Sequence, residues 1–404
     1  MKKSLIAVAV AGLFAAPVAM AEVTLSGAIN LGIELGRTTA GTAPGGSSLT
    51  TTSLNSHYSH VDLESVDDIG GGNKIVFHYQ LNAAPQNVRG INDDNRNSFL
   101  GVVGDWGAFK MGSNENVYER MMYTADPMDG AVGPGGNLNI LGTPGAGNVF
   151  EVGQGNCGLA TGAFVIDPAT GSTTPNASLG TGGCVGFYRR SEQTIWYESP
   201  NFGGFSFEVD YTLSAFKTSG GTDPKLVSIG GKFQPEGAPF YIDLAYEKHD
   251  DMFGANRLGA VGGTGSSDTG IQVGGGWMMG DLGLHLRYER LNYNTEGVAA
   301  GTVSEYKRNA YWFGVKYNLP SGYVGGELGI AQEGETNLAT AANTGAKMFA
   351  VGYFHNLSKQ SQLQFIYGRT DNDSAGTYAQ IGSPNGGVAG ADHQVIALNL
   401  KHTF

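Results

Sequence analysis

The sequence predicts an all-β protein, a closed antiparallel β-barrel of sixteen membrane-crossing strands. Sixteen segments alternate apolar and polar residues, and this period of two gives a β-strand two different faces. The links between them are alternately short and long, as in even-stranded barrels with tight turns at one rim and long loops at the other. After the first twenty residues, no apolar run approaches the roughly 18 residues of a membrane-spanning helix.

The N-terminus predicts export. Lys2 and Lys3 precede the apolar run 5–18, and residues 19–21 (A-M-A) form a small-residue cleavage site. This is the pattern of a secretory signal peptide over residues 1–21. The mature protein is then a single barrel domain, residues 22–404, whose place is the outer membrane.

The predicted strands follow one another along this domain. In the first, Ile33 and Leu35 alternate with Gly32 and Glu34, so that the two pairs lie on opposite faces. Each segment reaches or approaches the 9–11 residues that a tilted membrane strand requires. The strands are 23–37, 56–66, 73–81, 96–103, 107–112, 191–198, 204–213, 225–233, 240–248, 270–278, 282–291, 306–319, 322–331, 346–355, 361–369 and 392–404.

The two predicted faces differ in chemistry. One carries large apolar side chains such as Phe240, Ile242 and Leu244, and the other carries polar and charged ones such as Asp243 and Glu247. A packed soluble sandwich would place the apolar set inside. We therefore expect the apolar face to meet lipid or a neighbouring subunit, and the polar face to line a hydrated lumen.

One link is much longer than the others. Residues 114–190 are rich in Gly, Pro, Asn and Thr and contain both cysteines, Cys157 and Cys184. An exported chain with an even cysteine count favours a disulfide between them, with two free thiols as the alternative. The link could cover the mouth of the barrel or fold inward and narrow the wide lumen of a sixteen-stranded barrel.

Several segments resemble the general porins of Gram-negative outer membranes, chiefly the β-proteobacterial branch. They lie in order along the mature chain, and no single match is specific alone. They are residues 96–101 (R-N-S-F-L-G), 104–112 (G-D-W-G-A-F-K-M-G), 197–205 (Y-E-S-P-N-F-G-G-F), 357–361 (L-S-K-Q-S) and 401–404 (K-H-T-F).

This resemblance implies a homotrimer and passive diffusion of small hydrophilic solutes. It implies that the link between strands 5 and 6 folds into the lumen, where its acidic residues face basic residues of the wall. It also implies that Phe404 is the assembly signal, the alternative being an ordinary lipid-facing aromatic. The sequence departs from the family pattern where His60 and Glu64 replace an Arg and a Lys, and where residues 112–114 (G-S-N) lack another Arg.

Charge suggests which solutes pass. Removing Lys2 and Lys3 leaves 22 basic and 36 acidic residues, which changes the formal charge from −12 to −14 and argues against nucleic acid as a partner. By strand parity, acids outnumber bases in the lumen. The acids are Glu34, Asp62, Glu64, Glu198, Glu208, Asp210, Asp243, Glu247, Glu289 and Glu327, and the bases are Lys74, Lys110, Lys232, Arg287, Lys316 and Lys401.

Acidic linings favour cations, so we expect a weakly cation-preferring pore. The alternative is that many of these acids are solvated at the rims and have little effect. On the loop, the expected constriction residues are Glu115, Glu119, Asp126 and Asp129. On the wall, the candidates are His60, Asp62, Glu64, Lys74, Lys110 and Arg287.

Other functions fit less well. A barrel enzyme needs an activated nucleophile with His and carboxylate support, and the sequence shows no such motif. No cofactor or metal site is expected. A solute-specific channel with a binding site built by the long link remains the main alternative, and an adhesin is another. The expected partners are two further copies of the chain, outer-membrane lipid and lipopolysaccharide, and small solutes.

Overall fold

The structure is a computed structural model that describes residues 22–42, 47–86, 90–92, 96–124, 126–128, 133–145, 164–166, 173–175, 186–188, 190–213, 223–251, 265–296, 303–338, 340–341, 343–384 and 388–404. The predicted signal peptide, Cys157, Cys184 and Asp129 lie outside these residues.

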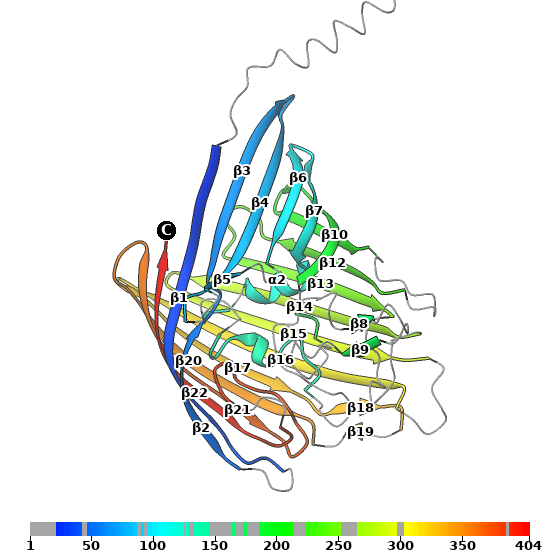
Figure 1. Ribbon diagram of the computed structural model, residues 1–404, viewed down its shortest axis with the longest axis vertical. Coiled ribbons are helices and arrows are strands. Elements are labelled where there is room, and N and C mark those ends of the chain that lie inside the picture. Colours follow the sequence, from blue (N-terminus) through cyan, green and yellow to red (C-terminus); the bar gives the residue numbers. More distant parts are fainter. Residues whose placement is uncertain are drawn as a thin grey trace, which may run out of the picture.

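Sixteen long antiparallel strands form the wall of the molecule (Figure 1). They are β1 (Glu22–Thr38), β3 (His60–Gly70), β4 (Asn73–Ala84), β6 (Ser98–Gly104), β7 (Gly107–Glu115), β10 (Arg190–Glu198), β11 (Phe205–Thr212), β12 (Lys225–Phe233), β13 (Phe240–Asp250), β14 (Ser267–Met279), β15 (Leu282–Asn294), β16 (Glu305–Leu319), β17 (Gly322–Ala331), β20 (Ala346–Asn356), β21 (Ser361–Asn372) and β22 (His393–Thr403). The strand prediction is confirmed.

Shorter elements occupy the longer links. They are β2 (Leu49–Ser56), β5 (Gly90–Asn92), α2 (Val117–Tyr123), the 3-10 helix η1 (Asn137–Asn139), β8 (Phe164–Ile166), β9 (Thr173–Pro175), β18 (Gly334–Thr336) and β19 (Thr340–Ala341). Within the described ranges, no helix has both the length and the apolar character needed to cross a membrane.

The sheet closes on itself through its first strand. One edge of β1 pairs with β22 from Ala28 to Thr38, and the other edge pairs with β3 and then with β2. Every other wall strand pairs antiparallel with its neighbours in chain order. Among the described strands, closure leaves no edge strand, which a wall in contact with hydrocarbon requires because lipid cannot hydrogen-bond a free backbone edge.

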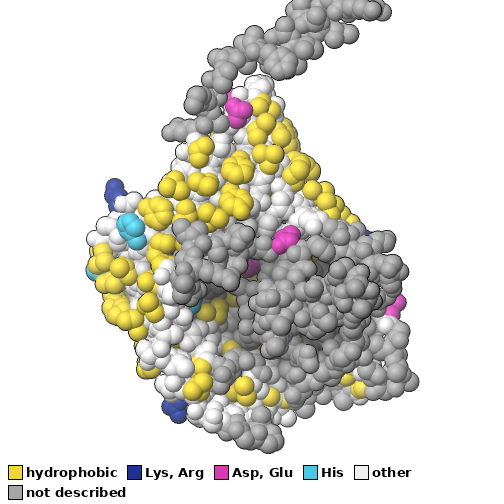
Figure 2. Space-filling view, viewed as in Figure 1, with side chains coloured by type: hydrophobic (Ala, Val, Ile, Leu, Met, Phe, Trp, Pro, Cys, Tyr) yellow, Lys and Arg dark blue, Asp and Glu magenta, His cyan; other side chains and the backbone are white. Residues whose placement is uncertain are grey.

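The two faces of the wall have the expected chemistry. On β13, Ile242, Leu244 and Tyr246 are 54%, 49% and 37% exposed on the outside, whereas Asp243 and Glu247 are buried on the inside. Figure 2 shows hydrophobic side chains gathered over the strands in the upper part of that view. Exposed apolar and buried charged residues are the reverse of a soluble protein and fit a wall surrounded by lipid.

The second predicted strand, 56–66, is divided in the structure. Residues 57–59 interrupt it between β2 and β3, and Tyr58 has a positive φ of 52°. The side chain of Ser59 compensates for the broken ladder, because its Oγ accepts a hydrogen bond from Asn30 N at 2.8 Å. The wall next to β1 is therefore longer than predicted, and it begins at Leu49.

Candidate functional site: the interior of the barrel

Helix α2 begins on the inner face of the wall. The Val117 N–H donates to Asp210 Oδ2 at 2.6 Å, and the Tyr118 N–H donates to Ser228 Oγ at 3.2 Å. Neighbouring strands thus supply the N-terminal cap that Asn116 does not provide. Gly230 leaves the space that the side chains of Val117 and Met121 occupy. These contacts fix α2 inside the ring of strands (Figure 1).

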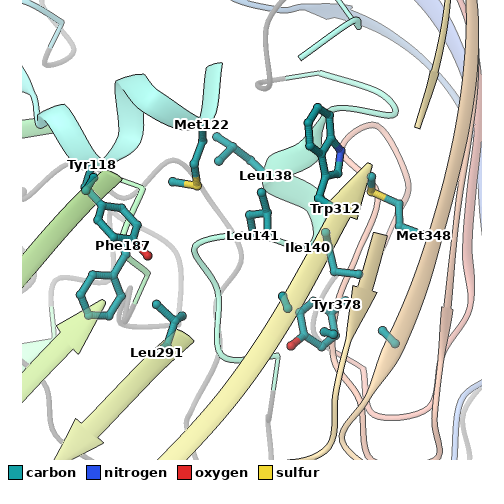
Figure 3. Packing of buried hydrophobic residues seen from close by; sticks show 14 of the residues in the cluster. Tyr118, Met122, Leu138, Ile140, Leu141, Phe187, Leu291, Trp312, Met348 and Tyr378 are labelled. Carbon is teal, nitrogen blue, oxygen red and sulfur yellow. The ribbon is translucent and has the colours of Figure 1, made fainter. Parts of the chain in front are cut away.

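An apolar cluster continues this attachment. Tyr118 and Met122 from α2, with Leu138, Ile140 and Leu141 beyond it, pack against the inner wall. Figure 3 shows these side chains pointing toward residues of the wall strands and of other links, which are Leu291, Trp312, Met348, Phe187 and Tyr378. Buried apolar area stabilises residues 117–124 and 133–145 in this position.

A buried ion pair joins the wall to this segment. Arg308 on β16 pairs with Glu289 on β15 at 2.7 Å, and neither side chain is exposed. Glu289 also accepts hydrogen bonds from Tyr118 Oη at 3.0 Å and from Gly142 N at 2.9 Å, and Arg308 Nε donates to Thr143 O at 2.8 Å. We call Glu289 and Arg308 the loop anchor.

A second segment, between β21 and β22, also contacts the loop inside the barrel. Gln380 Oε1 accepts a hydrogen bond from Gly135 N at 3.0 Å, and Gln380 Nε2 donates to Thr370 Oγ1 on the wall at 2.9 Å. The next residue, Ile381, donates its N–H to Asn139 Oδ1 at 2.8 Å. We call residues 376–384 the strap, because they bind the loop and the wall together. The sequence analysis did not predict this contact.

The acidic residues expected at the constriction have different roles in the structure. Glu115 is buried and pairs with Arg190, and Glu119 is buried and accepts a hydrogen bond from Tyr123 Oη. Asp126 is partly buried and accepts hydrogen bonds from Met128 N at 2.7 Å and Asn137 N at 2.8 Å. The buried carboxylates of Glu115 and Glu119 hold the loop, whereas Asp126 caps its turn and stays partly exposed.

Helical geometry explains the position of Glu119. In α2 it lies on the same buried side as Tyr118 and Met122, because residues three and four apart share one face. Burial, and next the negative charge of Glu115, raise the pKa of the Glu119 carboxyl to about 8. Arg120 instead is 31% exposed and pairs with Glu208 of the wall. The resemblance implied acids on the loop and bases on the wall, but in this pair the base Arg120 is on the loop and the acid Glu208 is on the wall.

The predicted wall residues His60, Asp62 and Glu64 do come together, on β3. Asp62 lies 3.2 Å from His60 Nε2, 3.6 Å from His78 Nε2 on β4, and accepts a hydrogen bond from Gln80 Nε2 at 2.9 Å. Glu64 lies 2.9 Å from His78 Nδ1 and is 48% exposed. We call His60, Asp62, Glu64 and His78 the histidine–carboxylate cluster.

The predicted wall bases lie at three different places. Lys110 Nζ lies 2.7 Å from Glu198 and stands over the Phe99 ring, beside the histidine–carboxylate cluster. Arg287 is buried and donates to Asp243 at 2.8 Å and to Gln272 at 2.6 Å. Gln272 Nε2 donates to Tyr118 O, which connects Arg287 to the loop.

Lys74 is exposed on β4, beside the tight turn to β3. It is therefore closer to a rim than to the loop.

Sequence reasoning missed three buried or partly buried bases, Arg96, Arg190 and Arg308. Arg308 shares the parity of Lys316, so strand periodicity could have placed it in the lumen. Arg96 and Arg190 lie where a link meets a strand, and there strand parity does not determine whether a side chain points inward or outward. Arg96 lies 5.3 Å from the centre of the Tyr58 ring, and Arg190 pairs with Glu115.

A closed sheet with an apolar outside and a charged inside defines a β-barrel protein of an outer membrane. The chain matches the family described as Gram-negative porin over residues 7–375, and it belongs to that family. It is thus an outer-membrane channel protein and not an enzyme.

Known proteins of similar sequence or structure are outer-membrane proteins and porins. The chain is 24% identical over 410 residues to "Outer membrane porin protein 32" of Delftia acidovorans, with all of both chains covered. It is 28% identical over 243 residues to "Major outer membrane protein P.IB" of Neisseria gonorrhoeae, over 59% of this chain and 55% of that one. The structure resembles the "Anion-selective porin from Comamonas acidovorans" with a TM-score of 0.68 and 18% identity, over 95% and 100% of the two chains.

Proposed function

We propose that the chain forms a water-filled channel through which small hydrophilic solutes and ions diffuse passively, with a weak preference for cations. The observation that carries this proposal is water access to charged side chains inside the closed wall. Glu64, Glu198 and Arg120 are 48%, 30% and 31% exposed there. Helix α2 lies inside the lumen, where it packs against β11, β12 and β13.

The balance of charge favours cations. Strand parity with Arg308 added gives ten inward acids against seven inward bases, and the structure adds the acids Asp268 and Glu115 and the bases Arg96 and Arg190. Lys110, Arg120, Arg287 and Arg308 each pair with a wall carboxylate. Asp62 and Glu64 contact imidazoles rather than a lysine or an arginine. A carboxylate in a narrow, low-dielectric passage raises the local concentration of cations.

The name of the Comamonas relative describes the opposite selectivity for that protein. Ion preference depends on individual lumen charges, which two proteins at 18% identity need not share. The test is the zero-current potential of the purified protein in a planar bilayer under a KCl gradient. We expect this potential to have the sign that results when K⁺ passes through the channel faster than Cl⁻. The opposite sign would refute the cation preference but leave the channel standing.

A solute-specific channel is the second candidate. Phe99 stacks on His78 with ring centroids 5.2 Å apart and contacts Trp196 edge-on at 5.3 Å. Aromatic rings flanked by Lys110 and Glu198 could hold a solute with an apolar face and polar groups. Saturable block of the ion current by one solute among sugars, phosphates and peptides would favour this function over general diffusion.

The assembly of the protein is also a proposal. We infer a homotrimer in lipid and lipopolysaccharide, supported by the similar fold of the trimer form of OmpT of Vibrio cholerae, with a TM-score of 0.58, 12% identity, and 95% and 99% of the two chains covered. Phe404 is 45% exposed on the outer face with Leu400 and Leu398, which suits an assembly signal. Cleavage after residue 21 and the Cys157–Cys184 disulfide remain predictions.

A further inference from the structure

The lysine and arginine side chains on the outside of the barrel lie at one end of the wall. In the described wall strands, each outward-facing base belongs to the strand end that leads into a long link, and each alternates with buried, inward-facing neighbours. These bases are Arg37, Lys225, Lys248, Arg290, Lys307, Lys347 and Arg369. Because the long links of an outer-membrane barrel face the cell exterior, these bases lie on the side of the outer leaflet.

Aromatic rings mark the depth of these bases in the membrane. Several of the bases have an aromatic residue on the same outer face, two residues nearer the middle of the strand. The pairs are Tyr288 with Arg290, Phe349 with Lys347, Tyr246 with Lys248 and Tyr367 with Arg369. Aromatic girdles lie at the boundary between hydrocarbon and headgroups. Since two residues span about 7 Å of a strand, the bases lie just outside that boundary, at the level of the headgroups.

Most of these bases pair with an acid two residues farther from the membrane. The pairs are Lys225–Asp223 and Lys248–Asp250 at 2.7 Å, Arg369–Asp371 at 2.6 Å and Lys307–Glu305 at 2.5 Å. Arg290 and Lys347, and Arg37 on a distant part of the wall, form no ion pair with any residue that the structure describes. The charges of Arg290 and Lys347 are therefore available to an anion in the headgroup layer.

Arg290 and Lys347 line one groove on the outer face, with a volume of about 700 Å³. Asn309 and Gln332 line it between the two bases, and Asn309 Nδ2 donates to Gln332 Oε1 at 3.1 Å. Arg290 is on β15 and Lys347 is on β20, which β16 and β17 separate. Three steps between neighbouring strands put the two bases about 14 Å apart across the sheet. The groove thus has two positive ends and an uncharged polar middle.

We propose that this groove binds the headgroup of an outer-leaflet glycolipid, a disaccharide with a phosphate at each end. The Arg290 guanidinium binds one phosphate, which its planar donors can contact in pairs, and the Lys347 ammonium binds the other. The amides of Asn309 and Gln332 meet the sugar hydroxyls, and the acyl chains follow the exposed apolar surface that begins at Ile330. The inference rests on the proposed placement of the protein in lipid and lipopolysaccharide, and it names where that lipid is held.

The acids that line the groove lie mainly at its outer end. Glu333, Glu335 and Asp373 follow the ends of β17 and β21, and Asp371 pairs with Arg369. Phosphates attached next to the acyl chains therefore meet the bases, whereas the acids face the sugars farther out. This order of charges favours direct contact between phosphate and base over a bridge through a divalent cation.

The experiment titrates lipid A, the acylated diphosphoryl disaccharide of lipopolysaccharide, onto the full-length mature protein in detergent, with bound lipid counted by native mass spectrometry. The wild type should bind diphosphoryl lipid A about tenfold more tightly than the monophosphoryl form. Arg290→Gln with Lys347→Gln should bind the diphosphoryl form about tenfold more weakly and no longer distinguish the two. Lys225→Gln with Lys248→Gln is the matched control. It removes the same charge from the same end of the wall, but from bases paired with acids, and should bind like the wild type.

Two added reagents separate recognition of the lipid from other sources of binding. EDTA should leave the affinity of the wild type for diphosphoryl lipid A unchanged, and loss of binding in EDTA would overturn direct contact between phosphate and base. Millimolar inorganic phosphate should not displace the lipid, and displacement would overturn the assignment to a glycolipid. If the double variant does not fold, Lys347→Gln alone should lose most of the discrimination between the two forms of lipid A.

Equal affinities of the two double variants for diphosphoryl lipid A would overturn the inference. Both variants should conduct ions like the wild type in planar bilayers, because the substituted side chains face away from the lumen. A wild-type protein that binds lipid A as expected but forms no channels would overturn the proposed function and leave the lipid site standing.

Discussion

Glu289 and Arg308 are diagonal neighbours on β15 and β16, 2.7 Å apart and completely buried, and both also bind the loop inside the barrel. Burying two charges is costly, and geometry and additional hydrogen bonds must offset that cost. Here the additional partners are Tyr118, Gly142 and Thr143 of the loop. The loop therefore completes the hydrogen bonding of the ion pair, and the ion pair fixes the position of the loop.

Removing one member of the loop anchor should release the loop. Glu289→Ala leaves Arg308 buried without its carboxylate, a change that typically costs about 3–5 kcal/mol. We expect channels that still insert but show larger open-state current noise and a lower voltage threshold for closure. Single-channel recording measures both. Glu305→Gln is the control, because Glu305 pairs with Lys307 on a solvent-accessible part of β16. Wild-type noise in Glu289→Ala would contradict the anchoring role.

The strap should limit the width of the channel. Gln380→Ala removes one hydrogen bond to Gly135 and one to Thr370, each worth about 0.5–1.5 kcal/mol. Residues 376–384 should then detach more often, which admits larger solutes. The size limit for poly(ethylene glycol) that enters the pore should rise. Gln332→Ala, which alters an exposed contact with Asn309, should leave the limit unchanged. Equal limits in both variants would exclude the strap as a size determinant.

Asp126 tests whether the loop lies in the current path. Asp126→Asn removes a negative charge beside Pro127, whose carbonyl lies against Gly325 of the inner wall. We expect a lower cation preference or a changed conductance in bilayer recordings, and a larger effect when Asp129→Asn is added. Glu236→Gln, on the exposed turn between β12 and β13, provides the control. No change in either quantity with both substitutions would count against a loop inside the lumen.

Glu119 makes docking of the loop sensitive to alkaline pH. The pKa of its carboxyl in the folded loop is about 8, above its ordinary value of 4.5. The docked loop therefore retains a proton that an undocked loop loses. The stability of docking is greatest below about pH 4.5 and decreases as the pH rises to about 8. We expect faster proteolysis of the loop at about pH 9 than at about pH 6, and little pH dependence in Glu119→Gln. Identical profiles would refute this assignment.

The strands of the wall could be predicted because their sequence pattern depends only on residues that are close together in the chain. Alternation with a period of two depends on neighbouring residues alone, and segments such as Lys225–Phe233 and Gly322–Ala331 are strands with the predicted bounds. The break at 57–59 was missed because it depends on Ser59 and His57 reaching residues of β1. Such compensation between distant segments leaves no periodic signal.

The contacts inside the barrel were less predictable, because they also join segments that are far apart in the chain. Parity predicted Asp62, Glu64 and Lys110 on the inner face, and the structure shows Asp62 and Glu64 beside His78 and Lys110 beside Glu198. The role of Glu119 depends on how α2 is rotated, and Asp210 and Ser228 set that rotation from strands far along the chain. The role of Glu115 depends on the pairing of β7 with β10, which places Arg190 opposite it. The strap follows a link without periodicity, and its contacts through Gln380 could not be foreseen from composition.

The most direct test of the account is the reversal potential of the purified wild-type protein in a planar bilayer under a KCl gradient at neutral pH. A hydrated lumen with more acids than bases predicts stable ohmic channels whose reversal potential has the sign of K⁺ diffusion. A membrane that stays non-conducting after insertion of folded protein, or a potential with the sign of Cl⁻ diffusion, would contradict it.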